Sequence, residues 1–360
     1  MIVTYVHSSS PIDQFRVQLR CRNFADAITR MGWHTANLLD INSFIQNSPE
    51  AQAICLASDL IVVHRYLYGP VLRAVQYWKA RDKKVIVDFD QAINYLAPNC
   101  PGYSFWMEGL PLGMVDGGTK KSEQIIDPIP LEQFKWGLGL VDAASVPSSR
   151  LADDWARYTR VMEIPDYLNT DHYPALLRDH EAEIWIGLCL CTNSDSFVES
   201  GLLKAMQNIC RLRPKVKLVL SESDAFPTGG MDIPSSQVIT YPALLFDDWA
   251  NILPRLDIGL VPLHGDYDLR ISSISLLEFM LSKIPWIATD LASFRSLSAY
   301  GTLIQNLSAD WESAILHSID HLDASRKKAA GEPFLFALSQ DVNGNIDKVL
   351  KLYTTILNQV

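Results

Sequence analysis

The sequence predicts an α/β protein with two domains, each containing a parallel sheet. Short runs rich in Val and Ile recur along the chain, segments long enough for a helix separate them, and a polar stretch without periodicity divides the chain near its middle. Continuously apolar strands that alternate with helices are typical of parallel sheets covered on both faces. With 360 residues, the chain is long enough for two domains that each have a core.

The apolar runs predict ten strands, five in each half of the chain. Alternation with helices makes both halves Rossmann-like. The predicted strands are residues 2–8, 34–39, 60–65, 84–90 and 143–148 in the first half, and 184–190, 216–221, 237–242, 258–263 and 285–290 in the second.

The segments between the strands carry helix signals. Residues 15–32 end on Gly32, a frequent residue after a helix, and residues 70–84 end on cations, which a helix C-terminus favours. The terminal segment 342–359 has the pattern of an amphipathic helix. Periodicity alone leaves open whether that helix stays with the second domain or crosses back to the first.

The two domains are predicted to join around residues 165–180, where prolines bracket a polar stretch. Ligands of such folds bind in the cleft that faces the carboxyl ends of the strands. Residues 97–133 contain five glycines and several prolines. A loop of this length is usually functional or disordered, so we expect either a flexible, substrate-covering loop or an inert insertion.

Charge and composition exclude some classes of function. The net charge of −10 is concentrated in residues 166–360, which carry −9, whereas residues 1–165 carry −1. Nucleic-acid binding requires clustered cations, so we expect no nucleic-acid partner. An acidic second half would have to hold a phosphate-bearing ligand through backbone dipoles and one or two placed cations.

The remaining bulk features predict a soluble cytoplasmic protein. The six cysteines include no CxxC pair and are expected to be reduced and buried. The first residues form a strand pattern without the basic region and cleavage site of a signal peptide. No apolar run approaches the ~18 residues of a membrane span.

The most informative stretch is residues 269–290, LRISSISLLEFMLSKIPWIATD. Ser272, Ser273 and Ser275 place hydroxyls and backbone N–H groups at a helix start, which is a favourable site for an anion. Arg270 can add a bidentate contact to a phosphate. Glu278 can accept two hydrogen bonds from a vicinal diol such as a ribose. The alternative is a capping box, in which Glu278 only returns to the backbone of Ser275.

Residues 257–290 resemble the donor-binding segment of GT-B glycosyltransferases, especially the retaining family 4-like group. Looser matches cover nearly the whole chain, including residues 15–33, 57–91, 142–155 and 161–174. In that family the glutamate at the position of Glu278 grips the nucleotide ribose, and the last helix crosses back to the first domain. The chain departs from the family pattern at Arg270, where the family has a glutamate, and at Ser275, where it often has a lysine.

The resemblance and the strand ends indicate further site residues in the first half. Ser9 follows the first strand, where the family has a loop that approaches the donor phosphates; the alternative is a turn that starts a helix. Asp88 and Asp90 end a strand and could orient an acceptor hydroxyl or act as its base, unless Asp90 merely caps the next helix. Arg16 belongs to the following helix and faces either the cleft or solvent.

His64 and Arg65 end the third predicted strand and are further candidates for acceptor binding, with ordinary surface polarity as the alternative. Trp33 and the cations of the first helix could contact anionic lipid or an anionic acceptor, whereas a solvated face is the simpler interpretation. These cations are Arg16, Arg20, Arg22 and Arg30.

The resemblance implies an acceptor-binding domain at 1–168, a nucleotide-sugar domain at 169–330, and a terminal helix at 331–360 that packs on the first domain. It implies transfer of a hexosyl group from a nucleoside-diphosphate sugar to an acceptor hydroxyl, with retention and without metal or cofactor. The acceptor would be a glycan, a lipid-linked molecule or a protein, with peripheral membrane contact as an option. The alternative is a catalytically inactive GT-B scaffold or regulatory partner subunit.

Overall fold

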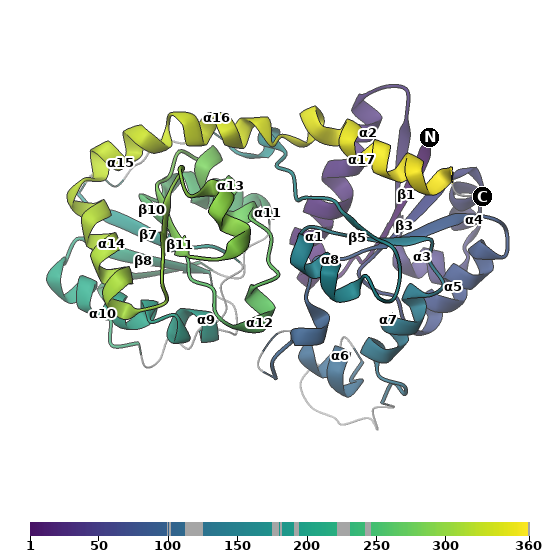
Figure 1. Cartoon of the computed structure of the whole chain (residues 1–360), viewed down its shortest axis with the longest axis horizontal. Coiled ribbons are helices and arrows are strands. Elements are labelled where there is room, and N and C mark those ends of the chain that lie inside the picture. The colour runs from purple at the N-terminus through teal and green to yellow at the C-terminus, as the bar shows by residue number, and fades with distance from the viewer. Residues whose placement is uncertain are drawn as a thin grey trace. The chain divides into compact units, whose positions relative to one another are not determined.

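The structure is a computed structural model that describes residues 1–98, 100, 102–111, 125–174, 180, 182–190, 194–221, 231–241 and 246–358. The chain divides into two compact units (Figure 1). Unit 1 comprises Met1–Asp166 and Asn345–Val360, and unit 2 comprises Tyr167–Gly344. Each unit contains one six-stranded parallel sheet, which confirms the predicted two-domain α/β fold.

The sheet of unit 1 has the strand order β2-β1-β3-β4-β5-β6. Neighbouring strands are parallel, so their carboxyl ends lie along one edge of the sheet. The strands are β1 Ile2–His7, β2 Thr35–Asp40, β3 Leu60–His64, β4 Lys84–Asp88, β5 Ala143–Val146 and β6 Val161–Glu163.

The sheet of unit 2 has the order β12-β11-β10-β7-β8-β9 and is also parallel. Its core includes Ile186, Leu218 and Leu260 from the central strands. The strands are β7 Ile184–Leu188, β8 Val216–Ser221, β9 Val238–Tyr241, β10 Ile258–Val261, β11 Trp286–Thr289 and β12 Thr302–Ile304.

The helices of unit 1 follow the predicted alternation. The first helical segment contains a π-helical turn, Gln18–Arg22, between α1 and α2, and Gly32 follows it with φ of 85°. The helices are α1 Gln14–Val17, α2 Asn23–Arg30, α3 Ile41–Gln46, α4 Pro49–Ala57, α5 Gly69–Lys79, α6 Tyr103–Glu108, α7 Pro130–Leu138 and α8 Ser149–Trp155.

The helices of unit 2 include α13, which contains Glu278. Helix α16 is also part of unit 2, where the ring centroid of its Phe334 lies 4.4 Å from Lys283 Nζ. The helices are α9 Ser194–Glu199, α10 Leu202–Leu212, α11 Phe246–Ile252, α12 Gly265–Asp268, α13 Ile274–Leu281, α14 Ser308–Asp320, α15 Leu322–Ala329 and α16 Glu332–Ser339.

The terminal helix α17, Val342–Leu357, crosses back to unit 1, as the fold prediction requires (Figure 1). The buried hydroxyls of Tyr5 in β1 and Tyr353 in α17 are 3.3 Å apart. Arg160 also donates a 3.0 Å hydrogen bond to Thr355. The first and last parts of the chain therefore build one unit.

Candidate functional site

Helix α13 follows β10 and the short helix α12 in the chain, and its start differs from a capping box. Its N-cap is Ser273, and Ser275 already lies in the first turn, buried to 6% exposure. The amide of Ile274 donates to Ser272 Oγ over 3.4 Å. Because Ser275 is not the N-cap residue, the capping box with Glu278 is not the observed geometry.

Glu278 instead interacts with residues far away in the sequence. It is only 1% exposed. The hydroxyl of Tyr173 donates to its Oε1 over 2.8 Å, and the indole Nε1 of Trp249 donates to its Oε2 over 3.4 Å. Burial and the neighbouring carboxylate raise the pKa of Tyr173 well above its usual value, so this hydroxyl stays protonated and remains a donor. Both carboxylate oxygens are thus oriented by neutral donors.

Arg270 is buried beside α12, with 4% of its surface exposed. Its Nη1 donates to the carbonyl oxygen of Asp266 and lies 3.6 Å from Asp266 Oδ1. The carboxylate of Asp266 is largely exposed. The guanidinium of Arg270 is therefore held beside α12 by the backbone carbonyl of Asp266 and by its solvated carboxylate. The segment between β10 and α13 therefore contains a buried cation, four residues before the first residue of α13.

A cavity of about 240 Å³ lies at the carboxyl ends of β10 and β11. Its wall is fixed by a local network, because Leu263 N donates to Thr289 Oγ1 over 3.0 Å and Thr289 Oγ1 donates to Asn306 Oδ1 over 2.8 Å. Asn306 Nδ2 returns a 2.8 Å bond to the Leu263 carbonyl. The carboxyl ends of parallel strands are the usual binding edge of α/β sheets.

Asp268 lines this cavity and was missed by sequence reasoning. It is 1% exposed; its Oδ2 accepts hydrogen bonds from Ser196 Oγ and from the amide of His264, the latter over 2.8 Å. Its Oδ1 has no hydrogen-bond partner among the described residues. Burial raises the pKa of Asp268 to about 6, with a further contribution from Asp195. The only sequence signal was its place two residues before Arg270.

In unit 1, Asp88 lies in a buried ion-pair network. Arg20 donates to both of its oxygens, over 3.0 Å to Oδ1 and 2.6 Å to Oδ2, and Ser145 Oγ donates to Oδ2 over 2.6 Å. Arg20 also binds Asp166 at 3.0 Å and the carbonyl of Ile164 at 2.7 Å. With Asp88 1% exposed and Arg20 fully buried, these contacts give Asp88 a structural role, and its catalytic role stays a prediction.

Asp90 contacts two other residues predicted from the sequence, Arg16 and Arg65. Its carboxylate lies 3.1 Å from Arg16 Nε and 3.1 Å from Arg65 Nη2. Burial acts to raise the pKa of Asp90, but Arg16 and Arg65 hold it well below its usual value. The alternative that Asp90 caps a helix is wrong, because the next 3₁₀ turn, Ile93–Tyr95, has Ala92 as its N-cap.

Arg65 has a backbone φ of 64°, a region that non-glycine residues seldom occupy and that clusters at functional sites. Its Nη1 donates to buried Asp13 over 2.6 Å. The adjacent His64 is fully buried, and neither of its ring nitrogens has a hydrogen-bond partner among the described residues. Burial, followed by the charge of Arg65, lowers the pKa of His64 to about 3, so the ring is neutral.

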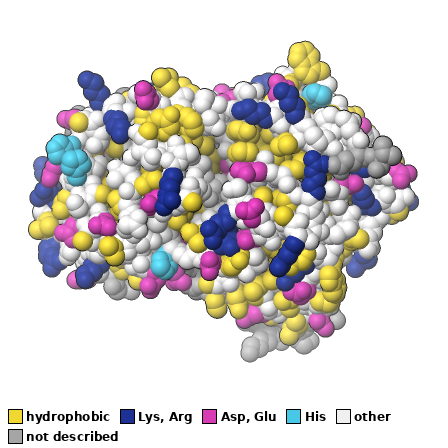
Figure 2. Space-filling view, viewed as in Figure 1, with side chains coloured by type: hydrophobic (Ala, Val, Ile, Leu, Met, Phe, Trp, Pro, Cys, Tyr) yellow, Lys and Arg dark blue, Asp and Glu magenta, His cyan; other side chains and the backbone are white. Residues whose placement is uncertain are grey.

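Other predicted positions have simpler surroundings. Ser9 follows β1 and donates to Asp40 at the end of β2. Of the first-helix cations, Arg20 is buried in the network above, so it cannot contact lipid. Trp33 is 78% exposed. Basic side chains on the face in Figure 2 are scattered among acidic and neutral ones.

The central part of the predicted loop at 97–133, residues 112–124, lies outside the described residues. No helix in the described part of the chain combines the length and apolarity that crossing a bilayer requires.

The two sheets, their strand orders and the returning terminal helix define the GT-B fold. No protein-family model and no curated protein matches the sequence. Among solved structures, sucrose-phosphate synthase from Thermosynechococcus elongatus is similar with a TM-score of 0.66 and 12% identity, over 99% of each chain. Anabaena HepE, solved with UDP-glucose, has a TM-score of 0.57 and 12% identity over 98% of this chain and 100% of its own.

The same fold also includes another reaction class. UDP-GlcNAc 2-epimerase from Neisseria meningitidis, solved with UDP-GlcNAc, has a TM-score of 0.52 and 10% identity over 99% of this chain and 100% of its own. Function therefore has to be argued from the site rather than from the fold.

Proposed function

We propose that this protein is a nucleotide-sugar-dependent glycosyltransferase that moves a hexosyl group to an acceptor hydroxyl with retention. The observation that carries the proposal is Glu278, a buried carboxylate that the start of α13 does not use as a capping box. It stands where the resemblance to retaining GT-B enzymes expects the ribose-binding glutamate. The whole-chain similarity to sucrose-phosphate synthase and to HepE, which was solved with UDP-glucose, supports the same class.

In this proposal Glu278 binds the ribose diol. The carboxylate is 1% exposed, so an incoming ribose must displace a present neighbour. The Tyr173 hydroxyl is a suitable neighbour to displace, because a ribose hydroxyl can replace its hydrogen bond to Oε1. Exchange of one neutral donor for another keeps the buried carboxylate satisfied, which avoids the cost of an unpaired buried charge.

The diphosphate is proposed to lie at the first turn of α13, with the amides of 272–275 and Arg270 as its donors. Amides at a helix start have no partner within the helix and favour an anion. Charge-assisted hydrogen bonds contribute roughly 1.5–3 kcal/mol each. During transfer the leaving diphosphate gains negative charge, and donors already held in place stabilise it.

The sugar is proposed to occupy the cavity at the ends of β10 and β11. Its volume of about 240 Å³ is below the about 300–1,000 Å³ of pockets for drug-sized ligands, so it suits one sugar ring rather than a whole nucleotide sugar. Asp268 Oδ1 would accept a hydrogen bond from a sugar hydroxyl. Asp268 would thus supply a carboxylate in the segment between β10 and α13, although position 270 carries arginine where the family has a glutamate.

The acceptor is proposed to bind unit 1 at the cluster of Arg16, Arg65 and Asp90, with His64 beneath it. A carboxylate whose pKa is held low is a weak general base. Asp90 is therefore assigned to orient the acceptor hydroxyl, and retention is assigned to donor positioning. Ser9 is proposed to approach the donor phosphates.

The proposal is tested by a thermal-shift screen over UDP, GDP, ADP, CMP and dTDP species, because a ligand that binds the folded state raises stability. One nucleotide family should stabilise the protein, and its sugar conjugate should then be hydrolysed or transferred, with the same rate in EDTA. Stabilisation by none of the nucleotides would contradict the proposal. Binding without turnover of any donor, together with tight binding of a protein partner, would favour the inactive scaffold.

A further inference from the structure

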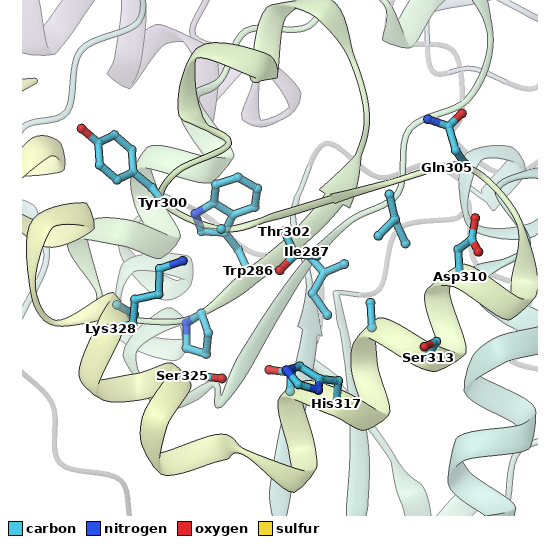
Figure 3. Close-up of a pocket in the computed structure, with 16 residues that line it drawn as sticks. Trp286, Ile287, Tyr300, Thr302, Gln305, Asp310, Ser313, His317, Ser325 and Lys328 are labelled. Carbon is cyan, nitrogen blue, oxygen red and sulfur yellow. The ribbon is translucent and has the colours of Figure 1, made fainter.

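A second and larger cavity, of about 560 Å³, lies in unit 2 away from the site proposed above (Figure 3). It is lined by the start of β11, the edge strand β12, and the helices α14 and α15. The smaller cavity lies at the other end of β11, where Thr289 contributes to its wall. Because parallel α/β sheets bind their substrates at the carboxyl ends, the larger cavity is a separate feature.

Trp286 provides a buried hydrogen-bond donor in this wall. The side chain is 2% exposed, and its Nε1 has no hydrogen-bond partner within the described part of the chain. A Cβ at Gly301 would lie 2.2 Å from the indole ring. The backbone of Gly301 therefore packs directly against the ring and restricts its position. An indole N–H can only donate, and a buried donor without an acceptor is destabilising. A bound oxygen acceptor would satisfy it.

Lys328 places a positive charge at the same end of the cavity. Figure 3 shows Trp286, Tyr300 and Lys328 together at one end. Lys328 is an exposed residue of α15 and forms no ion pair with any residue that the structure describes. An ammonium and an indole N–H can only donate hydrogen bonds. An anion can accept from both and also pairs with the positive charge of the ammonium.

The rest of the wall combines polar and apolar side chains. At the other end, Figure 3 shows Gln305, Asp310 and Ser313, which offer donors and acceptors. Ligand hydroxyls can donate to a carboxylate and accept from a hydroxyl or amide. The remaining lining includes hydroxyls of Thr302, Ser318 and Ser325, the imidazole of His317, and the apolar side chains of Pro285, Ile287 and Ile304.

We propose that this cavity binds a small polyol of sugar size that carries one phosphate or carboxylate group. The anionic group contacts Lys328 and Trp286 Nε1, and the hydroxyls face Asp310 and Ser313. The volume is within the about 300–1,000 Å³ of small-molecule sites. The site is independent of the proposed transferase site, because the two cavities share no lining residue.

Isothermal titration of the full chain without nucleotide tests this inference. The probes are glucose 6-phosphate, glucuronate, glucose and inorganic phosphate. Glucose 6-phosphate or glucuronate should bind at least tenfold more tightly than glucose and than phosphate. Lys328→Ala should weaken that binding about tenfold or more, the loss expected for a charge-assisted hydrogen bond, whereas the neighbouring exposed Lys327→Ala should leave it unchanged.

A second variant tests the indole. Trp286→Phe keeps an aromatic ring but removes the N–H donor, and it should weaken the same probe several-fold. Nucleotide stabilisation of Lys328→Ala should equal that of the wild type, so failure here is distinguishable from failure of the transferase proposal. The inference is overturned if none of the probes binds, or if glucose or phosphate alone binds as tightly as glucose 6-phosphate and glucuronate. It is also overturned if Lys328→Ala binds these two probes as tightly as the wild type.

Discussion

The buried carboxylates Asp88 and Asp90 of unit 1 and the buried Glu278 of unit 2 are held in opposite ways. In unit 1, Asp88 and Asp90 are paired with full positive charges, from Arg20 in one case and from Arg16 and Arg65 in the other. In unit 2, the donors to Glu278 that the structure identifies are the neutral groups of Tyr173 and Trp249.

This difference in hydrogen-bond donors distinguishes carboxylates with a structural role from a carboxylate that can bind a ligand. A buried ion pair is costly to break, since removal of one partner leaves an uncompensated charge. A carboxylate held by neutral donors can exchange one donor for a ligand hydroxyl at little cost. We therefore expect substitutions in the Asp88 network to change stability, and substitutions at Glu278 to change ligand affinity.

The largest effect is expected from Arg20→Ala. The variant leaves Asp88 and Asp166 buried without their cation, so the free energy of unfolding of unit 1 should fall by about 3–5 kcal/mol. Hydrogen exchange at the β4 amides reports on this unit separately. Arg213→Ala is the control, because its pair with Asp320 is exposed at 44% and 52% and should contribute about 1 kcal/mol or less. Equal losses in the two variants would contradict the comparison.

Asp268 sharpens the comparison, because no cation within the described residues forms an ion pair with it. Its pKa is raised from 3.8 to about 6 by burial. Between these values the folded protein retains a proton that the unfolded chain has released, so this group's contribution to stability is lost as pH rises from about 4 to 6. Asp268→Asn should remove that loss, which is on the order of 2–3 kcal/mol at about 1.4 kcal/mol per pKa unit.

Urea unfolding of the wild type and Asp268→Asn at pH 4, 5, 6 and 7 measures this difference. The gap between the two proteins should widen in favour of Asp268→Asn up to about pH 6 and then remain constant. Parallel pH profiles would show that Asp268 keeps an ordinary pKa.

The smallest effect is expected from Tyr173→Phe. Loss of one hydrogen bond to Glu278 should cost about 0.5–1.5 kcal/mol of stability. If ribose displaces this hydroxyl, nucleotide affinity should stay the same or rise. A drop in affinity as large as that of a Glu278 variant would mean that Tyr173 orients the carboxylate in the bound state as well.

Most of the fold could be predicted from the sequence, because parallel strands are continuously apolar. All ten predicted strands are present within a few residues of their expected bounds. The two missed strands, β6 and β12, have three residues each and lie at the sheet edges. An edge strand pairs with one neighbour only and can be too short to produce an apolar run.

The site was less predictable, because its contacts join distant residues. Spacing indicated Glu278 but could not separate a ribose ligand from a capping box, which depends on where α13 begins. Tyr173 is 105 positions from Glu278, and Ser196 is 72 positions from Asp268. Arg20 had the pattern of a solvated helix face, yet Asp88 and Asp166 draw it into the interior.

The central claim is that Glu278 binds a nucleotide, and calorimetric titration of Glu278→Gln tests it most directly. The titrant is the nucleoside diphosphate that stabilises the wild type most, and circular dichroism verifies the fold of the variant. The account predicts that affinity falls about tenfold or more, equivalent to about 1.4 kcal/mol. Equal affinity of a folded Glu278→Gln variant and the wild type would contradict it.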